Sequence, residues 1–455
     1  MFGIKINNYR SLSNQQFDFS KVNVLIGENS SGKSSLIKFL LFLKSSSILS
    51  SSSFKFNSDI GKYSDFVQGH DNNLDISFEF FLGKNYIDFF VKQLSDKEEF
   101  QGICQEISEL TGDDQKVTLS FCFNKDVPVN NSVNLSIKNS HFGEVVVIRK
   151  SSNEENIIQG EQCILKFYSQ KSNCEIELDE VSYDQHGFFS ITNGIDVKSK
   201  LEKKDDIDIS IFYDIVFLLV SQNYTQELLR LISYINPISS TPERSYNEND
   251  NQGSIYKVKD ISDVVNILSD QTLDKGVRNK LLQELNQALR FYGILYEVKI
   301  LASDFGPKEL KVKLRKDGIW SNIKDVGYGS SLQIPIIFQA LIGKIYGGET
   351  VIIEQPEVHV HPLLQSKFIE TLIKISNKNT YIIETHSPDI VRKLQVLVKN
   401  EKYKLSPKDV NIYYFKKPNN LSEITRHQIN ENGKLTPKFP SGFYDSSVNL
   451  VKELF

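Results

Sequence analysis

Apolar positions follow two different periods in the first half of this chain. The short apolar run VNVLI at residues 22–26 predicts a buried strand, and SLIKFLLFLK at residues 35–44 is typical of a helix. Between about residues 74 and 200, apolar and polar residues alternate in short segments separated by Asn, Asp, Gly and Ser. Strict alternation bounded by turn residues predicts strands, so this part is expected to be rich in β-structure.

Helical periods dominate the next stretch, from about residue 206 to residue 292. The period predicts helices over residues 211–235 and 277–294. In the second segment, one face carries Leu281, Leu282, Leu285 and Leu289. No heptad series continues far enough to predict a long coiled coil.

Buried elements return in the final third of the chain. Residues 326–348 (VGYGSSLQIPIIFQALIGKIYGG) predict an apolar helix with Pro335 near its first turn, where a missing N–H costs least. Further strands are expected at residues 350–354, 380–384, 410–417 and 423–430, followed by a short terminal helix.

Composition narrows the class of protein. An apolar content of 40% is enough to bury real cores, whereas no apolar run has the length of a membrane span and the first residues do not resemble a signal peptide. The four cysteines show no CxxC spacing, so we expect reduced thiols in a cytoplasmic protein without membrane contact. The net charge of −4 gives no general attraction to nucleic acid, and any DNA contact is expected to need a local patch or a partner.

The candidate chemistry begins with GENSSGKSS at residues 27–35, directly between the predicted strand and helix. A glycine-rich loop in this context directs backbone N–H groups at a polyphosphate, while Lys33 adds a charge and the Ser34 hydroxyl binds Mg²⁺. The pattern therefore predicts a nucleotide site. Its loop residues are Asn29, Ser30, Gly32, Lys33, Ser34 and Ser35.

Acidic and polar residues follow two of the later strands. Glu354 ends one strand and is followed by Gln355 and Glu357, and His386 follows the other strand within ETHSP. A carboxylate at the end of a buried strand can hold Mg²⁺, and an imidazole there can donate to a γ-phosphate. The pair His359 and His361 has the spacing of metal ligands, but no third ligand is evident.

The start of the apolar helix offers a further anion site. Gly329, Ser330 and Ser331 lie where unpaired N–H groups and hydroxyls are expected, and the same residues also suit ordinary helix capping.

The order and content of these motifs resemble the ABC-class ATPases of the SMC/RecF/OLD group. The likeness is closest to the short AAA-type members of anti-phage systems such as Septu (PtuA-like), Gabija and PARIS. It covers the loop at 27–35, GYGSS at 327–331, EQPEVHVHP at 354–362 and ETHSP at 384–388, and it extends to YINPISSTPERSY at 234–246.

The resemblance implies an α/β fold: an ABC-type head with a phosphate-loop core sheet, an antiparallel β sublobe, a helical insert and no long coiled coil. Residues 1–70 and 300–455 would form the head, residues 71–205 the sublobe and residues 206–299 the insert. Two such heads would face each other and enclose two nucleotides.

The resemblance also implies roles for single residues. Lys33 and Ser34 would hold the phosphates and Mg²⁺ of ATP, and Ser330 or Ser331 would reach the γ-phosphate in the partner head. Metal binding would fall to Ser34, Glu354 and Gln68, the last at the position of the Q-loop, and His361 and His386 would take the D-loop and switch positions. Arg10 either contacts the nucleotide or is a surface arginine.

Two departures from the relatives affect the expected activity. Leu332 stands where relatives often carry Gln, and Gln355 stands where most ABC ATPases place the catalytic glutamate. An amide cannot accept a proton at neutral pH, so hydrolysis should be slow unless Glu357 acts as the base.

The function expected from this resemblance is an ATP-binding sensor and scaffold of an anti-phage defence complex that forms homo-oligomers through its heads. Only about 65 residues follow His386, too few for an appended TOPRIM domain, so the effector nuclease, of HNH or TOPRIM type, is expected on a separate polypeptide that would also mediate any DNA contact. The alternative is a stand-alone DNA-repair ATPase of the RecF kind.

Overall fold

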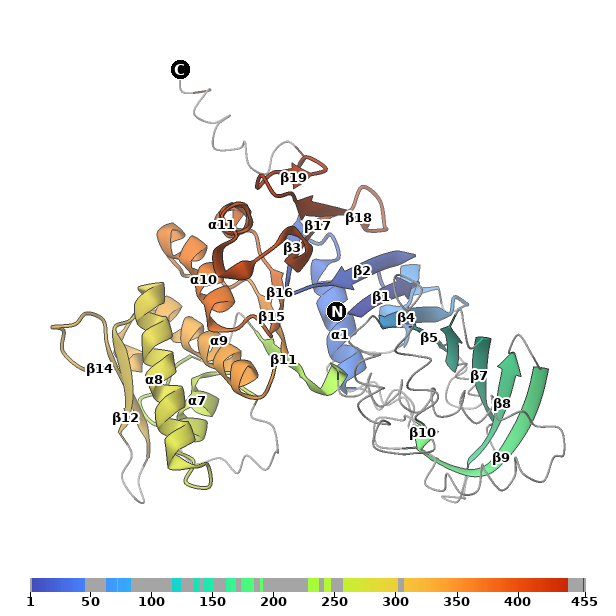
Figure 1. Cartoon of the computed structure of the whole chain (residues 1–455), viewed down its shortest axis with the longest axis horizontal. Coiled ribbons are helices and arrows are strands. Elements are labelled where there is room, and N and C mark those ends of the chain that lie inside the picture. The colour runs from blue at the N-terminus through green and yellow to red at the C-terminus, as the bar shows by residue number, and fades with distance from the viewer. Residues whose placement is uncertain are drawn as a thin grey trace. The chain divides into compact units, whose positions relative to one another are not determined.

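The computed structural model divides the chain into two compact units, which are described separately (Figure 1). Unit 1 comprises residues 1–19, 30–230 and 417–423, and unit 2 comprises residues 20–29, 231–416 and 424–455. The structure describes residues 2–45, 63–71, 73–82, 117–123, 135–139, 143–150, 161–168, 173–183, 189–190, 228–236, 241–246, 257–301, 307–440 and 453.

A seven-stranded sheet forms the centre of unit 2, in the order β11-β15-β16-β3-β17-β18-β19. Its first five strands are parallel to one another, and β18 and β19 pair antiparallel. The strands are β3 (Val22–Gly27), β11 (Ile232–Ile235), β15 (Thr350–Glu354), β16 (Thr380–Glu384), β17 (Val410–Lys416), β18 (Glu423–Ile429) and β19 (Leu435–Thr436).

The sequence of β3 explains its central position. Every residue of VNVLIG is buried, as expected for a strand whose two faces are both covered. Helices of unit 2 share one apolar core with this sheet. They are α7 (Ile261–Ser269), α8 (Lys275–Tyr292), α9 (Tyr328–Ile345), α10 (Pro362–Ile375) and α11 (Pro388–Lys399), with the short 3-10 turns η4 (Ile323–Asp325), η5 (Lys402–Lys404) and η6 (Pro407–Asp409).

Unit 1 contains a nine-stranded antiparallel sheet in the order β10-β9-β8-β7-β6-β5-β4-β1-β2. The strands are β1 (Phe2–Asn7), β2 (Gln15–Phe19), β4 (Ile76–Leu82), β5 (Val117–Phe123), β6 (Leu135–Asn139), β7 (Gly143–Lys150), β8 (Glu161–Tyr168), β9 (Asn173–Tyr183) and β10 (Phe189–Ser190). The expected β-rich character of this stretch is therefore confirmed. Unit 1 also contains α1 (Lys33–Ser45), α2 (Tyr63–Phe66) and η1 (Gln68–His70).

The α/β class with a mainly parallel sheet is confirmed, and so are α8 and the strands β15, β16, β17 and β18. The longest helices in the described ranges, α8 and α9, have 18 residues each, so no long coiled coil occurs there. The division into a head, a sublobe and an insert stays a prediction. The terminal helix lies almost entirely outside the described residues.

Two expectations about elements were wrong. Residues 232–235 form strand β11 beside β15, although the helical period was predicted to continue through them. A short apolar run with isoleucine at both ends suits a parallel strand as well as a helix. Pairing with the neighbouring strand β15 favours the strand. The segment after α8 also contains a three-stranded sheet of β12 (Glu297–Leu301), β13 (Glu309–Lys313) and β14 (Ser321–Asn322).

The second error concerns Pro335. The helix α9 begins at Tyr328 with Gly327 as its N-cap, so Pro335 lies inside the helix, about two turns from the start. Gly327, Gly329, Ser330 and Ser331 do open this helix, as predicted, with Gly327 as the N-cap and the other three in the first turn.

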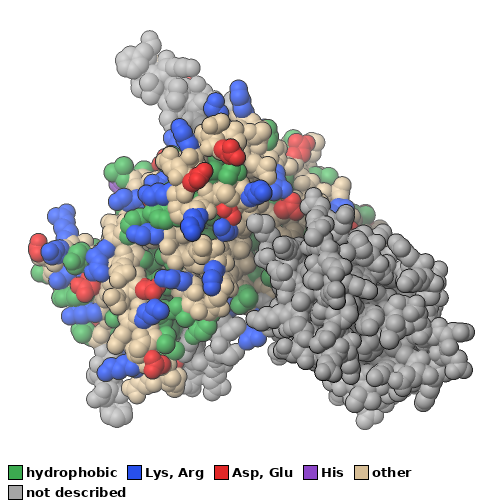
Figure 2. Space-filling model, in the orientation of Figure 1, with side chains coloured by type: hydrophobic (Ala, Val, Ile, Leu, Met, Phe, Trp, Pro, Cys, Tyr) green, Lys and Arg blue, Asp and Glu red, His purple; other side chains and the backbone are tan. Residues whose placement is uncertain are grey.

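Figure 2 shows the charge of one face of the described surface, where Lys and Arg side chains are spread over the helices of unit 2 and Asp and Glu are fewer. The net charge of −4 therefore does not describe every face of the protein. Of the helices in the described ranges, none combines the length and the apolar character that crossing a membrane requires.

Candidate nucleotide-binding site

The first half of the phosphate loop belongs to unit 2 and continues directly from β3. Gly27 has a φ of +144°, and a Cβ at this position would overlap the carbonyl oxygen of Phe415 on β17. The same carbonyl accepts a hydrogen bond from the Glu28 N–H at 3.2 Å. Glycine is therefore required at position 27 both by its backbone conformation and by the closeness of the next strand.

The second half of the loop belongs to unit 1 and leads into α1. Ser30 and Gly32 have φ values of +57° and +104°, and α1 begins at Lys33, which is only 4% exposed. The Gly32 carbonyl accepts hydrogen bonds from Ser35 N–H at 3.1 Å and Leu36 N–H at 3.3 Å. A tight turn, a buried lysine and a helix N-terminus are the features that suit a polyphosphate, so these residues fit ATP.

Two carboxylates end neighbouring strands of unit 2. Glu354 of β15 and Glu384 of β16 are in register, and Glu384 is also in register with Leu25 of β3. Because parallel strands end at the same edge, both carboxylates lie at the edge where β3 leads into the phosphate loop. Carboxylate oxygens are the ligands that Mg²⁺ prefers, so the donor set at this edge fits the metal.

Glu354 is held by a tyrosine from the neighbouring strand β11. Its Oε1 accepts a hydrogen bond from the Tyr234 hydroxyl at 3.1 Å. Burial raises the pKa of Tyr234, and the negative charge of Glu354 raises it further, so the tyrosine stays protonated and remains a donor.

Glu357 connects the turns that follow β15 and β16. Its Oε1 accepts a hydrogen bond from the His386 N–H at 2.6 Å, and its Oε2 accepts one from the Thr385 hydroxyl at 2.8 Å. The Gln355 N–H donates to the Glu384 carbonyl at 2.7 Å, and Gln355 has a φ of +44°. The structure thus brings together Gln355, Glu357 and His386, and it favours a positioning role for Glu357 over that of a free base.

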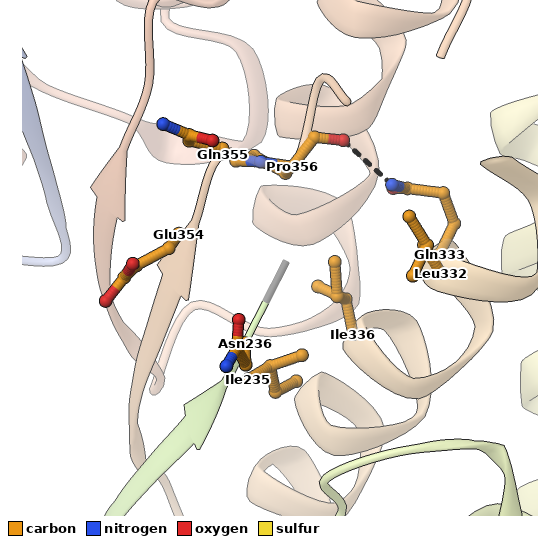
Figure 3. Close-up of a pocket in the computed structure, with 8 residues that line it drawn as sticks. All are labelled: Ile235, Asn236, Leu332, Gln333, Ile336, Glu354, Gln355 and Pro356. Carbon is orange, nitrogen blue, oxygen red and sulfur yellow. Dashed lines mark hydrogen bonds between the residues drawn. The ribbon is translucent and has the colours of Figure 1, made fainter. Parts of the chain in front are cut away.

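A small pocket lies between the end of β15 and helix α9 (Figure 3). The Gln333 side chain on α9 donates to the Pro356 carbonyl at 2.8 Å and accepts from the Tyr292 hydroxyl at 3.1 Å. This buried pair of bonds ties α9 to the turn that carries Gln355. The pocket is lined by Ile235, Asn236, Leu332, Gln333, Ile336, Glu354, Gln355 and Pro356.

The start of α9 packs against the loop after β15. A Cβ at Gly329 would overlap the His359 carbonyl oxygen, and the rings of Tyr328 and His359 meet edge to face at 5.4 Å. The Ser331 hydroxyl is buried and donates to the Tyr328 carbonyl at 2.7 Å, whereas Ser330 is half-buried. Of the two serines, Ser330 is therefore better placed to meet an external anion.

His361 lies exposed at the start of α10, where its Nδ1 accepts a hydrogen bond from Leu363 N–H at 3.3 Å. This is the position expected for the D-loop residue, and in this protein the imidazole serves as the N-cap of a helix. This bond occupies Nδ1, so Nε2 is the ring nitrogen that remains for an external ligand.

Arg10 and Gln68 lie together in unit 1. The Arg10 N–H donates to the Phe66 carbonyl at 2.5 Å, the Gln68 N–H donates to the Asn8 carbonyl at 2.9 Å, and the Arg10 guanidinium is 5.5 Å from the Phe66 ring. Arg10 Nε and Gln68 Oε1 are buried and have no hydrogen-bond partner among the described residues. Buried polar atoms are normally paired, so these two fit contact with a polar ligand.

The family of the chain follows from a comparison with known proteins. A family model described as an AAA ATPase domain matches residues 1–391. The protein belongs to this AAA ATPase domain family. A second model, described as a protein of unknown function (DUF3696), matches residues 405–454 of the AAA ATPase. A search of curated proteins found no match to the chain.

Solved structures of SMC head domains are similar to this AAA ATPase at low identity. The Smc head bound to the C-winged helix domain of ScpA has a TM-score of 0.43 at 11% identity, covering 94% of this chain and 97% of that chain. The Pyrococcus furiosus Smc head with an extended coiled coil, bound to the C-terminal domain of ScpA, has a TM-score of 0.40 at 10% identity and covers all of both chains. The Thermotoga maritima SMC head has a TM-score of 0.38 at 9% identity, with 93% and 97% covered. Likeness at these values supports no inference about function.

Three further residues of the AAA ATPase hold predicted site residues in place. Tyr234 binds Glu354, Thr385 binds Glu357, and Ser422 binds the phosphate loop. Tyr234 and Thr385 lie within motifs, YINPISSTPERSY and ETHSP, that could have pointed to them. No sequence signal points to Ser422.

Proposed function

We propose that this protein binds ATP with Mg²⁺, hydrolyses it slowly, and acts as the nucleotide-dependent scaffold of an anti-phage defence complex whose nuclease is a separate polypeptide. The observation that carries the proposal is the phosphate loop itself, placed between a fully buried strand and a helix that begins at a buried lysine. This arrangement suits the binding of a polyphosphate. An ordinary turn between a strand and a helix would not require a lysine directly after the second glycine.

Residues of the loop and of the strand ends would bind different parts of the Mg²⁺–ATP complex. Lys33 and the backbone N–H groups of the loop would pair with the phosphates of ATP, and the Ser34 hydroxyl and the Glu354 carboxylate would provide oxygen ligands for Mg²⁺. The metal, when bound, neutralises phosphate charge. Gln68 and Arg10 would each offer a buried polar atom that has no partner in the part of the chain that the structure describes. Asn29, Ser30, Gly32 and Ser35 would shape the loop.

Slow hydrolysis is proposed because no free carboxylate follows Glu354. Gln355 cannot take a proton from water, and both oxygens of Glu357 already accept hydrogen bonds from residues 385 and 386. His386 would then serve as a donor that reports the state of the nucleotide, with its backbone fixed by Glu357.

Self-association through the start of α9 is the next part of the proposal. The start of α9 is held in place by the close packing of Gly329 on the His359 backbone, and Ser330 is half-buried beside it. In the proposed assembly, this helix end of one subunit contacts ATP bound to a second copy, so the nucleotide acts as part of the interface. The helix N-terminus contributes a favourable field for an anion.

The decisive test combines nucleotide binding with mass measurement. We expect the wild-type protein to bind ATP, to gain mass as a homo-oligomer when ATP is added, and to co-purify with a nuclease encoded beside it. The Lys33→Ala variant should lose ATP binding and the gain in mass, whereas Lys38→Ala on α1 serves as the matched control. Retention of ATP by Lys33→Ala would refute the nucleotide site.

The same preparation separates defence from repair. A nuclease subunit whose activity depends on ATP supports the defence complex. Tight, salt-sensitive binding of duplex DNA by the isolated protein, without any nuclease partner, would instead favour a DNA-repair ATPase.

A further inference from the structure

A buried serine from the C-terminal region contacts the phosphate loop. Ser422 is 3% exposed, and its hydroxyl donates to the Ser31 carbonyl at 2.7 Å. The hydroxyls of Ser422 and Ser11 share a hydrogen bond of 2.8 Å, and the Ser422 N–H donates to the Ser11 carbonyl, also at 2.8 Å. All three serines belong to unit 1 and are buried.

The bond to Ser31 fixes the direction of the next N–H group. The Ser31–Gly32 peptide is trans, and in a trans peptide the C=O and the N–H point to opposite sides. A Ser31 carbonyl that is held by Ser422 therefore turns the Gly32 N–H to the side away from Ser422. Phosphate loops bind through such N–H groups, so the serine sets the orientation of a donor that it does not touch.

Gly32 shows that the two serines also limit the position of the loop. A Cβ at Gly32 would overlap the Ser422 hydroxyl and would lie 2.8 Å from the Ser11 hydroxyl. The loop consequently lies directly against this pair of hydroxyls and cannot move toward them. Any other residue at position 32 would have to displace both serines, in addition to adopting a φ of +104°.

Ser422 is far in sequence from the residues that it contacts. Its partners Ser31 and Ser11 are 391 and 411 residues away in sequence. A buried serine usually bonds to nearby backbone, whereas this one bonds only to the loop and to Ser11 among the contacts described. Phe415, seven residues earlier, holds the other half of the loop within unit 2 through its bond from Glu28.

We propose that Ser422 is a positioning residue of the phosphate loop, and that residues 405–454, matched by a family of unknown function, serve to complete the nucleotide site of this ATPase. The inference rests on the proposed binding of ATP. It assigns the C-terminal region a task in the site, since a carbonyl of the loop takes its orientation from a side chain of that region.

The test measures ATP affinity and thermal unfolding of the full chain. We expect Ser422→Ala to bind ATP about tenfold more weakly, a loss of about 1.4 kcal/mol, because the hydrogen bond that orients the loop carbonyl is lost. The thermal midpoint without ATP should fall by only about 2–4 °C, because a single buried hydrogen bond is lost from a large protein. Hydrogen exchange of the amides in residues 27–36 should be faster in this variant without nucleotide.

Two further variants make the result specific. Ser422→Thr keeps the hydroxyl and should recover affinity, and Asn420→Ala, exposed in the same loop, should bind like the wild type. If Ser422→Ala binds ATP normally while Lys33→Ala does not, the inference is wrong and the nucleotide site stands. A thermal midpoint that falls by more than about 10 °C in Ser422→Ala, with no recovery of affinity in Ser422→Thr, reveals a merely structural serine and also overturns it. Failure of the wild type to bind ATP would overturn both proposals.

Discussion

The carboxylate of Glu357 accepts a hydrogen bond from the Thr385 hydroxyl at 2.8 Å, and thereby joins the turns that follow two neighbouring parallel strands. Its other oxygen accepts from the His386 N–H. The position of His386 relative to Gln355 is thus set by a carboxylate whose two oxygens each accept a hydrogen bond. Glu357 therefore connects the two turns, and we expect it to act mainly by positioning His386.

Replacement of Glu357 tests that role. An amide at this position can accept one of the two hydrogen bonds but presents an NH₂ group to the other donor, so Glu357→Gln should lower the free energy of unfolding by about 1–3 kcal/mol. Thr385→Val should cause a smaller loss, and the two losses should not add. Denaturant titration of the single and double variants measures this coupling. Additive losses would show that the two side chains do not cooperate.

Gln355→Glu should speed ATP turnover. A carboxylate at this position could take a proton from water, and general-base assistance is worth about 10²–10⁴-fold. We therefore expect phosphate release to increase at least about tenfold, with Gln355→Ala unchanged from the wild type. Brisk turnover by the wild-type protein that also survives Glu357→Gln would contradict this account of the slow step.

Ser330 and Ser331 should differ in their effects. The Ser331 hydroxyl is buried and donates within its own helix, so Ser331→Ala should reduce stability by about 1 kcal/mol. Ser330→Ala should leave stability unchanged and reduce the ATP-dependent gain in mass. Sedimentation with and without ATP, together with thermal unfolding, separates the two effects. An equal loss of association in both variants would assign the contact to the helix end as a whole.

Glu370 should give the protein a stability that depends on acid pH. Burial works against its charge, but hydrogen bonds from Lys393 and Lys402 outweigh burial and hold the pKa of Glu370 at about 2. Since this pKa is lower in the folded state than in the unfolded state, the stabilisation is complete above the ordinary value of 4.5. It is lost as pH falls from 4.5 toward 2.

Glu370→Gln should lower the free energy of unfolding by about 2 kcal/mol at pH 7 and should flatten its pH dependence between pH 4.5 and 2. Urea unfolding at a series of pH values measures both effects, with the exposed Glu431→Gln as the control. An equal loss at pH 7 and at pH 2 would show that the ion pairs are not responsible.

Local signals predict the elements around the candidate site that are continuous in sequence. The apolar run of β3 and the helical period after Lys33 predict the strand and the helix that flank the loop, and β15 and β16 end at Glu354 and Glu384 as predicted. By contrast, the helical period extends through residues 232–235, because their strand character depends on β15, which lies far along the chain.

The sequence also left the role of Glu357 open, because the same residue type serves as a base or as a hydrogen-bond acceptor. The positions of Thr385 and His386 favour the second role, and only the folded chain reveals them. Ser422 could not be found at all, since its partner Ser31 is 391 residues away and a lone serine in a polar segment has no signature.

The place of β3 between β16 and β17 has a consequence for biosynthesis. The strand that leads into the phosphate loop leaves the ribosome near the beginning of translation, yet both of its neighbours are made more than three hundred residues later. Until then its apolar edges have no partner, and exposed strand edges invite aggregation. We therefore expect a chain that is shortened before residue 410 to aggregate more readily than the full chain.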